Sequence, residues 1–172
     1  MLQLPYPGGP EIEKIARQGN PNSHLLKAGK VKNSPLDFSF SGLKTNVFYL
    51  INGQNAREMK DNLLTASEKA DIAASFQKTA FTDLIHKCKL ALLKHPYKAI
   101  YLGGGVTNNR ALRSMLQNEI DHIPLFFPKN GLSLDNGAMI AGLGYHVFLN
   151  KNKEGDPLDL PAQTRIPFLT RS

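Results

Sequence analysis

Apolar residues recur with helical spacing in two stretches of the first half of the chain. Ile12, Ile15 and Ala16 fall on one face of a helix predicted over residues 11–18, with Pro10 as its first helical residue. The longest periodic run predicts a helix that begins at Thr65 or Ser67 and continues through residue 93. Its apolar stripe comprises Ile72, Phe76, Ala80, Leu84, Cys88 and Leu92. We expect both stripes to pack into a core, because an amphipathic helix buries its apolar face.

An extended segment that leads into another helix is predicted between these two helices. The letters DFSFSG, residues 37–42, alternate polar and aromatic side chains, which is typical of extended backbone. From Ser41 or Gly42 onward the apolar positions, beginning with Leu43 and Val47, follow a helical spacing. The pattern therefore predicts a strand-like entry to a helix.

The second half of the chain alternates between predicted strands and predicted helices. Strands are expected over residues 99–102 and 124–127, and helices over residues 109–117 and 136–149. Such alternation predicts an α/β fold class with a small sheet. The remaining residues, 151–172, carry charges and prolines and are expected to form an extended tail.

Composition narrows the class of protein without identifying it. The 172 residues are 41% hydrophobic and 20% charged, which is ordinary for a globular chain. A formal net charge of +7 favours anionic partners such as nucleic acid or a nucleotide. The chain has a single cysteine, Cys88, and therefore cannot form an internal disulfide. The sequence also lacks an uninterrupted run of 18 apolar residues, which a membrane-spanning helix would need. We expect a cytoplasmic protein.

Three consecutive glycines are the first candidate for chemistry. In AIYLGGGVTNNRALRSML, residues 99–116, they follow a predicted strand and precede a predicted helix. A flat ligand can lie against backbone that has no side chains, and N–H groups at the helix start can face polar or anionic atoms. Asn109 offers a donor and an acceptor to a base or a ribose. A tight turn that needs glycine for steric reasons explains the same residues, so both interpretations stay open.

Several well-known motifs are absent from the sequence. The glycine turn has Asn108 where a dinucleotide-binding G-x-G-x-x-G needs its last glycine, and Leu43 interrupts SGLKT as a Walker pattern. The sequence has no G-x-S-x-G elbow, and Cys88 lies in the middle of an apolar helix stripe. Nucleophilic catalysis by this chain alone is therefore not expected.

Asp135, in SLDNGAM, lies at the predicted start of the last helix. Its local sequence favours an N-cap, in which the carboxylate accepts backbone N–H groups and contributes about 1 kcal/mol. A metal ligand is the alternative, but a metal site needs several donors. The five histidines are scattered, and no two of them are four residues apart as a helical ligand pair would be.

Five ordered motifs connect the sequence to a known family. YPGGPEIEKIA, DFSFSGLKT, DIAASFQ, LGGGVTNNRALR and SLDNGAMIAGLG resemble the C-terminal half of the bacterial tRNA threonylcarbamoyladenosine transferase family, TsaD, over about residues 5–148. The resemblance implies one lobe of an actin-like (ASKHA, RNase H-like) ATPase fold with additional helices. Within that lobe we expect a helical part at residues 1–97, an α/β nucleotide-binding part at 98–150 and the tail at 151–172.

The resemblance also implies an activity. Enzymes of this family transfer the threonylcarbamoyl group from threonylcarbamoyl-AMP to the exocyclic amine of the adenosine next to the tRNA anticodon. The nucleotide ligand would be ATP or threonylcarbamoyl-AMP. The implied partners are tRNA, the N-terminal lobe of the same protein, the threonylcarbamoyl-AMP synthase and the accessory subunits TsaB and TsaE. The family was formerly described as an O-sialoglycoprotein endopeptidase.

The resemblance assigns roles to residues at matching positions. Gly9 would approach the nucleotide through its backbone, and Glu13 would accept ribose hydroxyls. The turn at Gly104 and Gly105 would receive the nucleoside, and Asn109 would contact it. No catalytic residue is assigned.

Asp135 becomes, by resemblance, the one metal ligand that this half contributes, with iron as the expected metal and zinc as the alternative. The family's paired histidines and its phosphate-binding loop have no counterpart in the chain, so we expect the chain alone to be inactive. Ser39, Ser41 and Lys44 match the family pattern, but no chemistry is assigned to them, and a packed strand-to-helix corner explains them equally well.

Two other functions remain as alternatives. The apolar helix stripes would let the chain act as a non-catalytic scaffold that docks partner subunits, although such stripes more often belong to a core. A metallopeptidase is the older description of the family, and the absence of a histidine pair argues against it.

Overall fold

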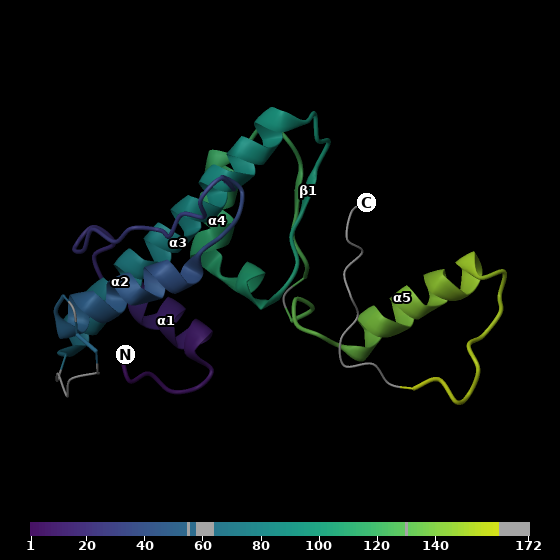
Figure 1. The fold of residues 1–172 in the computed structure, drawn as a ribbon, viewed down its shortest axis with the longest axis horizontal. Coiled ribbons are helices and arrows are strands. Elements are labelled where there is room, and N and C mark those ends of the chain that lie inside the picture. Colours follow the sequence, from purple (N-terminus) through teal and green to yellow (C-terminus); the bar gives the residue numbers. More distant parts are fainter. Residues whose placement is uncertain (55, 58–63, 130, 162–172) are drawn as a thin grey trace. The chain divides into compact units, whose positions relative to one another are not determined.

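A computed structural model describes the chain except for residues 55, 58–63, 130 and 162–172 (Figure 1). The chain divides into two compact units, Met1–Leu134 and Asp135–Ser172, and each is described by itself. The elements in order are α1 Gly8–Ala16, α2 Phe40–Asn52, α3 Ala66–Lys94, β1 Ile100–Tyr101, the 3-10 helix η1 Gly105–Asn108, α4 Arg110–Glu119, β2 Leu125–Phe126 and α5 Gly137–Asn150. The division expected at residue 97 stays a prediction.

The start of α3 is set by a capping box at Thr65, one of the two starts predicted for this helix. The Thr65 hydroxyl accepts the Glu68 backbone N–H at 3.2 Å, and the Glu68 carboxylate accepts the Thr65 backbone N–H at 2.8 Å. Two N–H groups that the first helical turn would leave unpaired are satisfied in this way. The helix ends at Lys94, just before His95-Pro96, where proline disfavours helical backbone in the residue before it.

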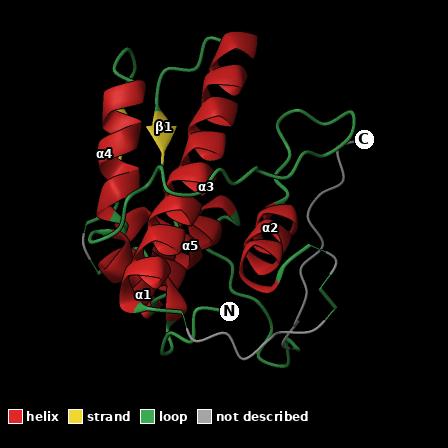
Figure 2. Ribbon diagram, turned by 90° about the vertical axis from the view of Figure 1, so that its left-hand side faces the viewer, coloured by secondary structure: helices red, strands yellow, loops and turns green. Residues whose placement is uncertain are grey.

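Three other helices of the first unit are arranged around α3 (Figure 2). Phe81 and Ile85 of α3 pack against α4, whereas Ile72 packs against α2. Ala73 and Ala74 pack against Ala16 of α1, where small side chains let two helices approach closely. The core of the first unit therefore consists of three apolar clusters along one long helix.

The apolar stripe predicted for α3 is only partly correct. Ile72 is buried as expected, but the other buried large apolar residues of the helix are Phe81 and Ile85. The remaining members of the predicted stripe border the clusters and are half-buried; they are Phe76, Ala80, Leu84, Cys88 and Leu92. A helix that is contacted from several sides has no single buried face, so one stripe does not describe its burial.

The predicted α/β class is confirmed only in a coarse form. The described residues are mostly helical, and β1 pairs in parallel with β2 through Ile100 with Leu125 and Tyr101 with Phe126. The expected strands at 99–102 and 124–127 are thus two residues long. Alternate residues of a strand face opposite sides of the sheet. Ile100 and Leu125 face the apolar cluster of α3 and α4 and pack against it.

Two predicted helix boundaries differ from the structure. The first helix begins at Gly8, before the expected first residue Pro10, and ends at Ala16, before the expected end at residue 18. Its N-cap, Pro7, has extended backbone. The second begins at Phe40 rather than at Ser41 or Gly42, after Ser39 forms an isolated antiparallel bridge with Gly29. The expected extended entry is therefore reduced to a single bridge.

The second unit contains α5, close to the helix predicted over residues 136–149. Its N-cap is Asn136, whose side chain accepts the Met139 backbone N–H at 3.0 Å. None of its residues is buried, although most of them are apolar. No helix in the described part of the chain is long and apolar enough to cross a membrane.

Candidate functional site

The glycine turn connects β1 to η1 and requires glycine at one position, Gly104. Gly104 has φ +86°, a left-handed conformation that side chains disfavour. A Cβ atom at Gly105 would lie 2.9 Å from Leu134 Cδ2, but this atom ends an exposed side chain that can move away, so Gly105 does not require glycine. The steric interpretation of the glycines therefore holds at Gly104. A Cβ atom at Gly103 or Gly104 would meet nothing within 4 Å, so the backbone there is also open to a ligand.

Two side chains hold the turn in place. Thr107 is buried, and its hydroxyl donates to the Gly104 carbonyl at 2.7 Å. The Arg113 guanidinium donates to the carbonyls of Thr107 and Pro128. These bonds connect η1 to α4 and to the residues that follow β2. They hold the open glycine backbone in one conformation.

Asn109 is the N-cap of α4 and is engaged at both ends of its amide. Its Oδ1 accepts the Leu112 backbone N–H at 3.1 Å, and its Nδ2 donates to Gln77 Oε1 at 2.8 Å. An amide has one further N–H and one further lone pair after these two bonds. Asn109 thus has a structural role in this site, and one donor and one acceptor remain for a ligand.

Glu13 joins α1 to the start of α4. Its Oε1 accepts the Arg110 backbone N–H at 3.2 Å and the Arg17 guanidinium at 2.8 Å. The Glu13 side chain is 16% exposed, so this carboxylate is largely enclosed. A carboxylate at the first N–H of a helix is favoured by the helix dipole as well as by the hydrogen bond. Glu13 therefore contacts Arg110, the residue that follows Asn109.

The structure brings together most of the residues that the sequence resemblance selected in the first unit. Glu13 bonds the residue that follows Asn109, and η1 links Asn109 to Gly104 through Thr107. Gly9 lies one helical turn before Glu13 and is exposed, with open space around its Cβ position. The arrangement combines open glycine backbone, one carboxylate and one amide, and these groups can accept from and donate to a nucleoside.

Gln77 belongs to this site but was given no role by the sequence analysis. It lies in DIAASFQ, one of the five motifs, and it is half-buried on α3. Its contact with Asn109 joins residues 32 positions apart. Helical spacing within α3 does not indicate which of its residues contact α4. The presence of Gln77 in a family motif was therefore the only sequence feature that could have pointed to it.

Asp135 is not the N-cap that its local sequence favoured. Asn136 caps α5 instead, and Asp135 precedes it as an exposed residue. Asp135 and the glycine turn belong to different units, so the structure leaves the metal role untested. Among the residues the structure describes, no three His, Cys, Asp or Glu side chains form a metal-binding group. The described residues therefore do not make a metal site by themselves.

Cys88 and the DFSFSGLKT residues have local explanations. Burial raises the pKa of the Cys88 thiol, and the residue packs beside the cluster of α3 and α4, which fits an unreactive cysteine. Ser39 and Gly29 form the bridge that precedes α2, and the Ser41 carbonyl accepts the Thr45 hydroxyl. Lys44 lines a cavity beside Ile12.

Comparison with known proteins identifies the family. The family model TsaD, described as tRNA N6-adenosine threonylcarbamoyltransferase, matches residues 1–142. A protein of that description from Protochlamydia amoebophila is 49% identical over 169 residues, which are 98% of this chain and 48% of the relative. Those from Chlamydia abortus and Chlamydia trachomatis are 45% and 40% identical over 151 residues, 87% of this chain and 43% and 44% of the relatives. The chain spans about half the length of the curated relatives it matches.

Proposed function

This chain belongs to the TsaD family of tRNA N6-adenosine threonylcarbamoyltransferases, and we propose from that membership that it is the C-terminal, actin-like lobe of such an enzyme. The complete protein would transfer the threonylcarbamoyl group from threonylcarbamoyl-AMP to the adenosine next to the tRNA anticodon. The new bond joins the exocyclic amine nitrogen to the carbamoyl carbon. The bond from that carbon to the AMP phosphate oxygen breaks, AMP leaves, and the amine gives up one proton.

The observation that carries the proposal is the junction of Glu13 and Asn109 at the open glycine turn. Glu13 would accept ribose hydroxyls with its second oxygen, and Asn109 would use its remaining N–H and lone pair on the nucleoside. The backbone at Gly104 and Gly105 would lie against the base, and Gly9 would approach the nucleotide by its backbone. ATP and threonylcarbamoyl-AMP share the adenosine that this surface would hold.

A metal would need ligands from outside the described residues. Asp135 is proposed as one carboxylate ligand, and iron or zinc is the expected ion. No group of three metal-binding side chains occurs in the part of the chain that the structure describes. The remaining ligands would come from the N-terminal lobe, which belongs to the half of the relatives' length that this chain does not span.

Transfer of labelled threonine into unmodified tRNA tests the proposal. The assay contains ATP, bicarbonate and the proposed cytoplasmic partners, which are the threonylcarbamoyl-AMP synthase, TsaB and TsaE. It compares the chain alone, the chain with the N-terminal half of the Protochlamydia amoebophila relative, and a fusion of the two. We expect label in tRNA only when the N-terminal half is present. No incorporation in any combination of folded components would contradict the transferase and favour a scaffold.

A further inference from the structure

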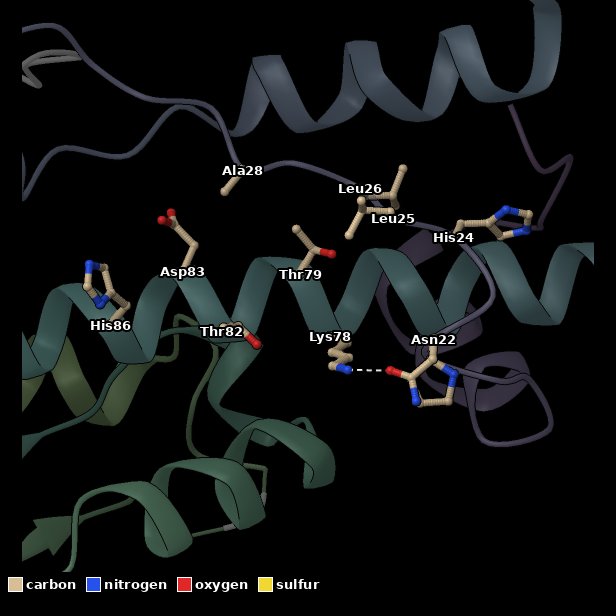
Figure 3. A pocket seen from close by; sticks show the side chains of 11 residues that line it. Asn22, His24, Leu25, Leu26, Ala28, Lys78, Thr79, Thr82, Asp83 and His86 are labelled. Carbon is tan, nitrogen blue, oxygen red and sulfur yellow. Dashed lines mark hydrogen bonds between the residues drawn. The ribbon is translucent and has the colours of Figure 1, made fainter.

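A groove runs between α3 and the segment of residues 21–37. Two cavities of about 410 Å³ and 400 Å³ lie along it and share Asp83 and His86 in their walls. Figure 3 shows Lys78 and Asp83 on α3 beside the segment, with Lys78 pointing to Asn22. From Lys78 to His86 the helix advances about 12 Å at 1.5 Å per residue, so the groove is longer than a single phosphate group.

Positive charge dominates this groove. Lys30 and Lys78 line the two cavities and are exposed. Lys27 and Lys32 are exposed on the same segment, beside the lining. Of the two carboxylates in the lining, Asp83 is paired with the buried Lys87 at 2.8 Å. The other carboxylate in the lining, Asp37, is outnumbered by Lys30 and Lys78 in the lining and by Lys27 and Lys32 beside it. A row of lysines along an elongated hollow attracts a polyanion more strongly than a single anion, because each charge adds to the same field.

Two exposed aromatic rings lie next to the same segment. Phe38 and Phe40 stack with centroids 5.5 Å apart and an interplanar angle of 3°. They are 43% and 49% exposed, and the Lys87 ammonium lies 4.4 Å from the Phe38 centroid. Basic grooves with exposed aromatic rings are typical of surfaces that bind single-stranded nucleic acid, because lysines follow the backbone and bases stack on rings.

We propose that this groove binds the phosphate backbone of RNA, and that Phe38 and Phe40 stack against bases of an unpaired stretch. The inference rests on the proposed function, because the RNA would be the tRNA that such an enzyme modifies. An anticodon loop offers unpaired bases, which is the part of a tRNA that aromatic rings can reach. The groove is separate from the glycine turn and would position the tRNA rather than take part in transfer.

Salt dependence of tRNA binding tests the lysines. Fluorescence anisotropy with labelled, unmodified tRNA and the 172-residue chain is measured from 50 to 300 mM KCl. The groove variant carries Lys27→Gln, Lys30→Gln and Lys32→Gln. The control variant carries Lys14→Gln, Lys129→Gln and Lys153→Gln, three lysines that belong neither to the segment of residues 21–37 nor to the groove lining. Both variants lower the formal net charge by three, so a difference between them reports position.

We expect the groove variant to bind about tenfold more weakly at 150 mM salt, with a log–log salt slope shallower by about 2. The control should change neither value appreciably. Phe40→Leu should weaken binding about fivefold and leave the salt slope unchanged, because stacking releases no counterions. Circular dichroism and a thermal melt confirm that each variant is folded. Equal weakening by the two lysine variants, or no weakening by either, would overturn the proposal.

The transfer assay separates this proposal from the proposed function. If the assembled enzyme transfers threonine but the groove variant has an unchanged KM for tRNA, the groove proposal is wrong and the transferase stands. If the groove variant binds tRNA weakly but no assembly transfers threonine, the groove stands as an RNA-binding surface and the transferase is wrong. Binding of double-stranded DNA with the same affinity and slope would show a general polyanion site and overturn the specificity for RNA.

Discussion

Gln77 Oε1 accepts a 2.8 Å hydrogen bond from Asn109 Nδ2, so a residue in the middle of α3 fixes the amide that caps α4. Gln77→Leu removes the acceptor and leaves a half-buried amide N–H without it. The free energy of unfolding should fall by about 1–3 kcal/mol, as for other buried donors that lose a partner. Urea unfolding followed by circular dichroism measures this loss.

A positioning role for Gln77 predicts more than lost stability. In the complete enzyme, Gln77→Leu should raise the Kd for a non-hydrolysable ATP analogue, because the Asn109 amide is then held only by its capping bond to the Leu112 N–H. Gln77→Glu keeps an acceptor oxygen and should restore most of the affinity. If both variants bind the analogue as the unmodified enzyme does, Asn109 does not use its amide on the nucleotide.

Glu13 provides a second prediction, about the contact between α1 and α4. Glu13→Gln keeps an oxygen for the Arg110 N–H but loses the ion pair with Arg17, whereas Glu13→Ala loses both. We expect Glu13→Ala to cost about 1–3 kcal/mol and Glu13→Gln clearly less, because the helix N–H is the costlier group to leave unpaired. Arg17→Ala is the control, and it should cost less than about 1 kcal/mol since Arg17 is 56% exposed. Equal costs for the two Glu13 variants would refute this ranking.

Local signals explain which parts of the fold could be predicted from the sequence. Thr65 with Glu68 marks the start of α3, and Asn109 is a good N-cap, so the starts of α3 and α4 were predicted to within a residue. Gly104 occupies a positive φ that its residue type favours. All of these depend on residues a few positions apart.

Long-range contacts explain what could not be predicted. The Glu13–Arg110 bond joins residues 97 positions apart, and the Gln77–Asn109 bond joins residues 32 apart. Periodicity describes one face of a helix, but α3 is packed on several sides, so Phe81 was missed as a core residue. Asp135 and Asn136 are both good caps, and only the backbone geometry distinguishes them. The family resemblance supplied the site residues, whose contacts then came from the structure.

The two residues before α5 should respond differently to substitution. Asn136→Ala removes the side chain that accepts the Met139 N–H, so hydrogen exchange of the first turn of α5 should accelerate about fivefold, the equivalent of about 1 kcal/mol. Asp135→Asn leaves that cap in place and should not change exchange there. In the complete protein, Asp135→Asn should lower the metal content measured by mass spectrometry. Unchanged metal content would remove Asp135 from the proposed ligands.

Cys88 should be slow to react with thiol reagents. Burial raises the pKa of its thiol, so less thiolate is present at a given pH than for an exposed cysteine. We expect iodoacetamide at pH 8 to alkylate the folded chain at least about tenfold more slowly than it alkylates glutathione, and the urea-unfolded chain at a comparable rate to glutathione. Because Cys88 is the single cysteine, mass spectrometry follows it without background. Fast alkylation of the folded chain would contradict the burial.

The capping box of α3 predicts how stability changes with pH. Hydrogen bonds from the Thr65 backbone N–H and hydroxyl lower the pKa of the Glu68 carboxyl below its ordinary value. A carboxyl whose pKa is lower in the folded than in the unfolded state stabilises the fold above its unfolded pKa, and this contribution is lost as the pH falls through the folded pKa. Glu68→Gln should therefore be less stable than the unmodified chain at pH 7, and this difference should disappear on acidification to about pH 3.

Glu154→Gln is the control, because it removes an exposed carboxylate that follows α5, and it should not give that pH-dependent difference. Urea unfolding at pH 7, 5 and 3 measures all three chains, and a Glu68→Gln difference that stays constant with pH would show that the capping box contributes by packing rather than by charge.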